Sequence, residues 1–243
     1  GPPPSAATGV TLQIAEVVNA HLSRDELVDY QVTGELRVVP SKSPAVASEF
    51  RFRMRNAHHI EQIKVNDKFV KVAAGTYTVV LPAAHQEQPL PLIKYTASSR
   101  WRPVPLFVDA SALETSADEV VVQARLRANP QLTTPLEQLT VHAAVGAADS
   151  CVVKAPGTWD AESGRLSWRL PQLHAQTALC SAQLSGAGVA ARALRAPLEV
   201  HFACEGVTIS GIELEVQMGS GGVNPIGALQ RRFATGSYKV SAQ

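Results

Sequence analysis

Basic side chains alternate with apolar ones in the segment Phe50–Arg55. Arg51, Arg53 and Arg55 occupy every second position, and such residues of a β-strand share one face at a spacing of about 6.6–6.8 Å. A row of guanidinium groups can hold carboxylates through charge-assisted hydrogen bonds. Three lysines follow in the next stretch of chain: Lys64, Lys68 and Lys71. The segment predicts a basic strip for an acidic ligand, although a solvated strand face carries the same pattern.

Two kinds of acidic ligand fit this strip. One is an extended peptide with acidic side chains. The other is an anionic lipid surface, which contributes roughly 1 kcal/mol for each basic residue close to it. An edge strand could also accept a peptide by strand addition, which alternation alone does not reveal. The net charge of the chain is only +1, so we expect no whole-domain basic field of the kind that binds nucleic acid.

Three further side chains are candidates for partner contacts. Trp101 stands between two arginines in a polar, turn-like segment, which makes it a candidate exposed anchor, with packing under a loop as the alternative. Arg231 and Arg232 are adjacent, so they should point to opposite faces of their strand. One of them could neutralise Glu213 or Glu215 on a neighbouring strand, and the other could be exposed.

The sequence carries no catalytic or metal-binding pattern. None of its seven histidines stands at His-x-x-x-His or His-x-His spacing. His58 and His59 are adjacent, and on a strand they would point to opposite faces, which is poor geometry for one metal. The nucleophile motif Gly-x-Ser-x-Gly is absent from the sequence, and the acidic residues are scattered. We therefore expect a protein that is not an enzyme and needs no cofactor or metal.

The cysteines, the hydropathy pattern and the amino-terminal residues indicate in which cellular compartment we expect the protein. Cys151, Cys180 and Cys204 are odd in number and widely spaced, which disfavours both a zinc site and a disulfide framework. Reduced core cysteines in the cytosol are the simpler interpretation. No run of 18 apolar residues occurs, so we expect no membrane span. The opening residues Gly1–Ala7 do not read as a signal peptide, and the initial Gly-Pro resembles a protease scar, so we expect a fragment of a larger protein.

A period of two dominates the hydrophobic pattern and predicts antiparallel β-sheets with one wet face. Turn-forming segments such as Asn129–Pro135 and Gly186–Gly188 separate the runs. About fourteen to seventeen short strands in this arrangement indicate β-sandwiches. The predicted strands are Val10–Val18, Val28–Val39, Phe50–Met54, Gly75–Leu81, Leu90–Ser98, Val120–Arg127, Leu139–Val145, Leu166–Leu170, Ala178–Leu184, Leu198–Ala203, Ile212–Met218 and Tyr238–Ser241.

Two weak seams, near Ser111–Asp118 and Ala193–Pro197, enclose a self-contained run of strands. We interpret this run as a second sandwich inserted into the first. One helical turn is predicted at Ala112–Asp118. The predicted division is subdomain A from residues 10–118 and 197–243, with subdomain B, residues 119–196, inserted.

Four segments carry a family resemblance. In their order and separation they resemble the mu homology domain of muniscins, the FCHo-like endocytic adaptors. The closing segment and the segment from a tryptophan to a leucine-proline pair are the most specific, and the resemblance extends from about Val10 to Ala242. The four segments are Val32–Leu36, Thr158–Pro171, Glu205–Leu214 and Gln230–Val240.

The resemblance implies an elongated all-β mu homology domain of two antiparallel β-sandwich subdomains, one inserted into the other. Muniscins act in the cytoplasm at clathrin-coated pits, peripheral to the plasma membrane. Their mu homology domain binds EH-domain scaffold proteins through Asp-Pro-Phe-type motifs, with the clathrin adaptor complex and transmembrane cargo tails as further expected partners. Membrane contact in the family comes mainly from an amino-terminal module that this sequence does not contain.

The wider family includes clathrin-adaptor medium chains, in which a Trp-x-Arg pair builds the pocket for Tyr-x-x-apolar sorting signals. The matching stretch of this sequence is Gln230-Arg231-Arg232. Arg232 keeps the arginine, whereas Gln230 replaces the tryptophan. Without that aromatic wall, we expect binding of tyrosine signals at this position to be lost or much weakened.

The leading hypothesis is a module that binds short motifs of endocytic partners. The alternative is a peripheral membrane domain that binds anionic phosphoinositides through the basic strand face, and it predicts steep salt dependence. The near-neutral net charge weighs against lipid binding as the main activity. An extracellular carbohydrate-binding or adhesion sandwich conflicts with the three unpaired cysteines, and an enzyme lacks a recognisable set of catalytic residues.

Overall fold

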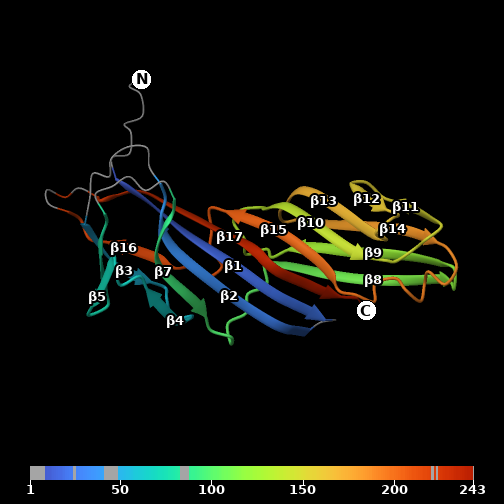
Figure 1. Ribbon diagram of the computed structural model, residues 1–243, viewed down its shortest axis with the longest axis horizontal. Coiled ribbons are helices and arrows are strands. Elements are labelled where there is room, and N and C mark those ends of the chain that lie inside the picture. The colour runs from blue at the N-terminus through green and yellow to red at the C-terminus, as the bar shows by residue number, and fades with distance from the viewer. Residues whose placement is uncertain are drawn as a thin grey trace, which may run out of the picture. The chain divides into compact units, whose positions relative to one another are not determined.

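The computed structural model describes residues 9–23, 26–40, 49–82, 88–219, 222 and 224–242. Within this part of the chain there are seventeen β-strands and no α-helix. Figure 1 shows how the strands are arranged. The strands form antiparallel sheets, which confirms the predicted all-β class. No helix in the described residues is long and apolar enough to cross a membrane. Residues Gly1–Ala7, where the sequence predicts no signal peptide, lie outside the described residues.

The chain divides into two compact units. Unit 1 consists of Gly1–Glu16, Val32–Trp101 and Gly206–Arg232, and unit 2 of Val17–Gln31, Arg102–Glu205 and Phe233–Gln243. Three long strands contribute residues to both units: β1 (Val10–Ser23), β2 (Glu26–Val38) and β17 (Ile226–Ser241). The subdomain bounds predicted from the sequence, 118 and 196, stay a prediction.

Unit 1 contains two groups of paired strands. One has the order β16-β3-β6-β5, and the other the order β17-β1-β2-β7-β4. The additional strands of this unit are β3 (Glu49–Arg55), β4 (Ile60–Val65), β5 (Val70–Ala73), β6 (Thr76–Val80), β7 (Leu90–Ala97) and β16 (Glu213–Val216).

Both strand groups of unit 1 contribute to one apolar core. Phe52 of β3 stacks on Tyr77 of β6 with ring centroids 5.2 Å apart. Leu12 and Ile14 of β1 and Leu92 of β7 are buried in the same cluster. Every second residue of these strands is buried, as the period of two requires for a sheet with one wet face. Unit 1 is therefore a two-layer sandwich.

Unit 2 also contains two groups of paired strands, with the orders β11-β14-β9-β8 and β12-β13-β10-β15-β17-β1-β2. Tyr238 of β17 joins the two groups, because its buried hydroxyl donates a hydrogen bond of 2.5 Å to the carbonyl of Leu106 on β8. The additional strands are β8 (Leu106–Ser116), β9 (Glu119–Ala128), β10 (Leu136–Ala144), β11 (Ser150–Val153), β12 (Gly157–Asp160), β13 (Arg165–Leu173), β14 (Thr177–Ser185) and β15 (Leu198–Glu205).

The structure corrects several predicted elements. The helical turn at Ala112–Asp118 is wrong, because β8 continues through most of this segment and pairs with β9, Ala112 opposite Val122. The last strand begins at Ile226, not at Tyr238, so it includes the whole Gln230–Arg232 stretch. Strands β4, β5, β8, β11 and β12 were not predicted; all but β8 are four to six residues long.

Candidate functional site

The predicted basic strip lies on the outer face of β3. Phe50 and Phe52 are buried in unit 1. Arg51, Arg53 and Arg55 occupy the alternate positions of the strand and are exposed. Strand β3 pairs with β6 on one side and with β16 on the other. The alternation of apolar and basic residues therefore places the three arginines as predicted, on one face of a four-stranded sheet.

Carboxylates share this face with the arginines. Arg51 lies 3.3 Å from the carboxylate of Glu49, and Arg55 forms an ion pair with Glu215 of β16. Arg53 donates a hydrogen bond of 3.2 Å to the hydroxyl of Thr76. Exposed ion pairs contribute only about 0.2–1 kcal/mol each. A ligand carboxylate can therefore replace Glu49 or Glu215, but the face as a whole is of mixed charge.

The structure separates the three lysines. Lys71 of β5 lies opposite Thr78, which in turn lies opposite Arg51, so Lys71 belongs to the same row as the strip. Lys64 belongs to the other layer of unit 1, on β4 beside β7. Lys68 lies in the segment between β4 and β5, and its ammonium group is 5.3 Å from the centroid of the Phe69 ring. Only Lys71 extends the basic strip across its sheet.

Trp101 is not the exposed anchor considered above. It is half-buried, and its ring stacks on His59 with centroids 4.5 Å apart and planes inclined by 14°. His58 lies against the other side of this pair, 3.9 Å from His59 between centroids. Desolvation and the neighbouring His58 lower the pKa of His59. The tryptophan therefore follows the alternative prediction, packing against a neighbouring segment.

Arg231 and Arg232 are both half-buried on β17. Strand β16, which carries Glu213 and Glu215, is not a hydrogen-bonded neighbour of β17, and Glu215 forms an ion pair with Arg55. Neutralisation of Glu213 or Glu215 by one of the two arginines stays a prediction. Gln230 is exposed and accepts a hydrogen bond of 3.2 Å from Gln13 of β1. Gln230 thus makes a polar contact between strands, and its match to the tryptophan of adaptor medium chains stays a prediction.

A buried carboxylate was missed by the sequence reasoning. Glu16 of β1 is 2% exposed, and its carboxylate accepts hydrogen bonds from the hydroxyl of Tyr95 at 2.6 Å and from the backbone N–H groups of Ile209 and Ser210 at 2.5 and 3.1 Å. Burial raises the pKa of Glu16, and these donors oppose that shift. The sequence pattern could have revealed it, because Glu16 follows Leu12 and Ile14 at every second position, on the buried face of the strand.

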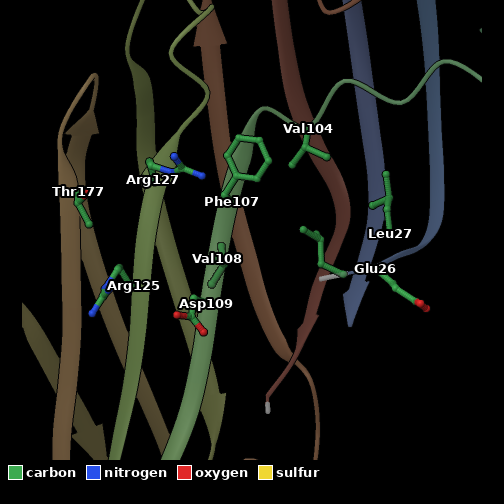
Figure 2. Close-up of a pocket in the computed structure, with 10 residues that line it drawn as sticks. Glu26, Leu27, Val104, Phe107, Val108, Asp109, Arg125, Arg127 and Thr177 are labelled. Carbon is green, nitrogen blue, oxygen red and sulfur yellow. The ribbon is translucent and has the colours of Figure 1, made fainter. Parts of the chain in front are cut away.

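Unit 2 carries a surface pocket of about 560 Å³, which we call the β8–β9 pocket. Side chains from β1, β2, β8, β9 and β14 and from the segment before β8 converge on it, as Figure 2 shows. Because most of these segments are far apart in the sequence, no local sequence motif predicts the pocket. Its lining residues are Leu22, Glu26, Leu27, Val104, Phe107, Val108, Asp109, Arg125, Arg127 and Thr177.

No group of three or more histidine, cysteine, aspartate or glutamate side chains in the described part of the chain is arranged to hold a metal ion. The thiols have no special activation either, since burial raises the pKa of Cys151 and Cys204 and raises that of Cys180 to about 12.

Comparison with known proteins places this architecture among mu homology domains. The Fcho1 mu homology domain of zebrafish (Danio rerio), solved with a bound Eps15 peptide, is 22% identical; the match covers 98% of this chain and 99% of that chain with a TM-score of 0.74. The yeast delta-COP-I mu homology domain is 15% identical over 96% and 97% of the two chains, with a TM-score of 0.70. The same yeast domain in complex with a Dsl1 WxWxV peptide is 13% identical. The match covers 96% of this chain and 98% of that chain, with a TM-score of 0.68.

The fold is therefore that of a mu homology domain. The family profile of the muniscin C-terminal mu homology domain matches residues 8–241. The chain belongs to this family, and the resemblance seen in the sequence is confirmed.

Proposed function

We propose that this chain is the motif-binding module of an endocytic adaptor, which recognises short linear motifs of the Asp-Pro-Phe type. The observation that carries the proposal is the muniscin family match over residues 8–241. The zebrafish Fcho1 domain of the same fold was solved with a bound Eps15 peptide. Because the two chains are only 22% identical, the ligand itself is part of the proposal.

The proposed partners are EH-domain scaffold proteins, with cargo tails and the clathrin adaptor complex as further partners. The proposed place of action is the cytoplasmic side of the plasma membrane, in clathrin-coated pits, and the proposed role is not enzymatic. The polar contact between Gln230 and Gln13 supports weak or absent binding of tyrosine signals at that position.

The basic strip is one candidate surface for the motif. Arg51, Arg53, Arg55 and Lys71 point outward from one sheet of unit 1, and the exposed ion pairs of Arg51 and Arg55 exchange readily with a ligand carboxylate. The carboxylates Glu49 and Glu215 on the same face weaken attraction to phosphoinositides, because they reduce the local positive potential. Motif binding is therefore favoured over lipid binding for this face.

Titration calorimetry tests the proposal. The protein is titrated with a peptide that carries several Asp-Pro-Phe motifs and, separately, with a Tyr-x-x-Leu peptide. We expect binding of the first peptide alone. Binding of only the tyrosine peptide, or of neither, would overturn the proposed ligand class.

A triple variant, Arg51→Glu, Arg53→Glu and Arg55→Glu, tests the strip. A matched control reverses two exposed charges of unit 2, Lys154→Glu and Arg169→Glu. If the strip holds the motif, the triple variant loses affinity while the control binds as the wild type. Equal affinity of all three proteins would remove the strip from the proposal.

A further inference from the structure

The β8–β9 pocket has an apolar side and a basic side. Leu22, Leu27 and Val104 form the apolar side. Arg125 and Arg127 of β9 form the basic side, two residues apart on the same exposed face of their strand. The volume of about 560 Å³ lies in the range of pockets that enclose a small ligand or a few side chains. Every lining residue belongs to unit 2.

Strand register fixes how the two sides meet. Phe107 of β8 lies directly opposite Arg127 of β9, and the guanidinium of Arg127 lies over the Phe107 ring, 5.0 Å from its centroid. Figure 2 shows Arg127 directed toward Phe107. The guanidinium is thus held beside the apolar side of the pocket, where its N–H donors can still reach a ligand.

Arg125 and Arg127 differ from most other exposed arginines in their partners. In the part of the chain that the structure describes, neither guanidinium has a carboxylate within 4.0 Å, and neither donates a side-chain hydrogen bond, whereas Arg51, Arg55 and Arg165 are each paired with a glutamate. Two arginines without a carboxylate partner can bind a ligand carboxylate without first breaking an ion pair.

Exposed apolar side chains continue from the pocket along the same sheet face. Leu179 of β14 lies opposite Arg125 and is 50% exposed. Leu113 of β8 is 52% exposed. Exposed apolar surface next to a pocket is characteristic of an interaction site rather than of a purely solvated sheet face. The lining also includes two acidic residues: Glu26 of β2, and Asp109 of β8, which lies opposite Arg125 in the strand register.

We propose that the β8–β9 pocket binds a short peptide segment in which a carboxylate stands within a few residues of an aromatic side chain. The carboxylate binds the guanidinium groups of Arg125 and Arg127, and the aromatic ring enters the apolar side formed by Leu22, Leu27 and Val104. This inference rests on the proposed function, and it places a motif-binding site in unit 2 that is separate from the basic strip of unit 1.

Fluorescence anisotropy with a labelled peptide that carries a single Asp-Pro-Phe motif tests the pocket. The double variant Arg125→Glu and Arg127→Glu should bind at least about tenfold more weakly, because two attractive charges become repulsive. Leu27→Asp, which alters only the apolar side, should also weaken binding. The matched control Lys154→Glu and Arg169→Glu reverses two charges elsewhere in unit 2 and should bind as the wild type. Circular dichroism and thermal unfolding check that every variant is folded.

A second peptide, with Asn in place of Asp, completes a double-mutant cycle. The Asn peptide should bind the wild-type protein about tenfold more weakly than the Asp peptide does. The Arg125→Glu and Arg127→Glu variant should bind the Asn peptide no worse than the Asp peptide, because this variant has already lost the guanidinium groups that pair with the carboxylate. If the losses of binding free energy from the peptide change and from the protein change simply add, the proposed contact between the carboxylate and these arginines is overturned.

The remaining outcomes separate this inference from the proposed function. If the Arg51→Glu, Arg53→Glu and Arg55→Glu variant loses the peptide while both pocket variants bind as the wild type, the pocket inference is overturned and the proposed function stands. If the wild type binds no Asp-Pro-Phe peptide, both are overturned.

Discussion

Replacing Glu16 should loosen the segment before β16. The carboxylate of Glu16 is the common acceptor for the hydroxyl of Tyr95 and for the backbone N–H groups of Ile209 and Ser210. Glu16→Ala removes this acceptor and leaves the donors without a partner in a buried place. Glu16→Gln keeps one oxygen acceptor but places an NH₂ group where the other oxygen accepted a hydrogen bond.

The magnitude follows from the number of donors. A buried donor without a partner costs about 1–3 kcal/mol, so the Tyr95 hydroxyl and the Ser210 N–H, which are both buried, predict a loss of about 2–6 kcal/mol for Glu16→Ala. We expect about 1–3 kcal/mol for Glu16→Gln, in which one donor loses its partner. The larger loss is a substantial part of the 5–15 kcal/mol typical for the stability of a whole protein.

The pH dependence has a defined sign. Burial raises the pKa of Glu16 above its ordinary value of 4.5. The folded state therefore holds the proton more tightly than the unfolded state does. The resulting stabilisation is fully present below pH 4.5 and is lost as the pH rises through the raised folded-state pKa. Glutamine does not titrate, so the advantage of the wild type over Glu16→Gln should shrink as the pH rises.

Hydrogen exchange and denaturant unfolding measure these effects together. Exchange at Ile209 and Ser210 should accelerate in Glu16→Ala and, less strongly, in Glu16→Gln, while the amides of β9 in unit 2 serve as an internal control. Unfolding of the wild type and Glu16→Gln is compared from about pH 4.5 to pH 8. A pH-independent difference between the two proteins, or unchanged exchange at Ile209 and Ser210, would refute the assignment of Glu16 as a buried, titrating acceptor.

Two further predictions concern single positions. A Cβ atom on Gly34 would overlap the ring of Tyr95, which lies directly opposite it, so Gly34→Ala should lower stability by about 1–3 kcal/mol in thermal unfolding; an unchanged melting temperature would contradict that close approach. Iodoacetamide followed by mass spectrometry should modify Cys151 first in the native protein, because Cys151 is half-buried whereas Cys180 and Cys204 are buried; equal labelling of all three thiols before unfolding would contradict their burial.

Hydrophobic alternation made the class of the fold predictable. Along β3 the apolar residues Phe50 and Phe52 point into the core and the arginines point out, so one strand of sequence sufficed to place the basic strip. Short strands were missed for the same reason. Seven of the ten residues of β4 and β5 are exposed, so these strands lack a regular alternation of buried and exposed residues, and pairing with neighbours rather than local pattern defines them.

The β8–β9 pocket could not be predicted, because it depends on the register of the β8–β9 hairpin and on residues of β1, β2 and β14, which are distant in the sequence. Phe107 and Arg127 are twenty positions apart, and only the pairing of β8 with β9 sets them face to face. Ion pairing is equally hidden: the sequence shows Arg51, Arg55 and Arg127 as the same residue type, whereas the structure gives the first two carboxylate partners.

The first, third and fourth family segments contribute to the framework of unit 1, whereas the second, Thr158–Pro171, lies in unit 2. Gly34, in the first segment, leaves room for Tyr95. Tyr95 binds Glu16, which also accepts hydrogen bonds from Ile209 and Ser210 in the third segment. That segment is tied to the last one by the hydrogen bond from the Gly206 N–H to the Arg231 carbonyl, 2.7 Å long. These segments thus help to hold β1, β2 and β7 around one buried carboxylate and join β17 to the third segment. The ligand-binding role that we propose for Arg125 and Arg127 depends on exposed side chains outside these segments.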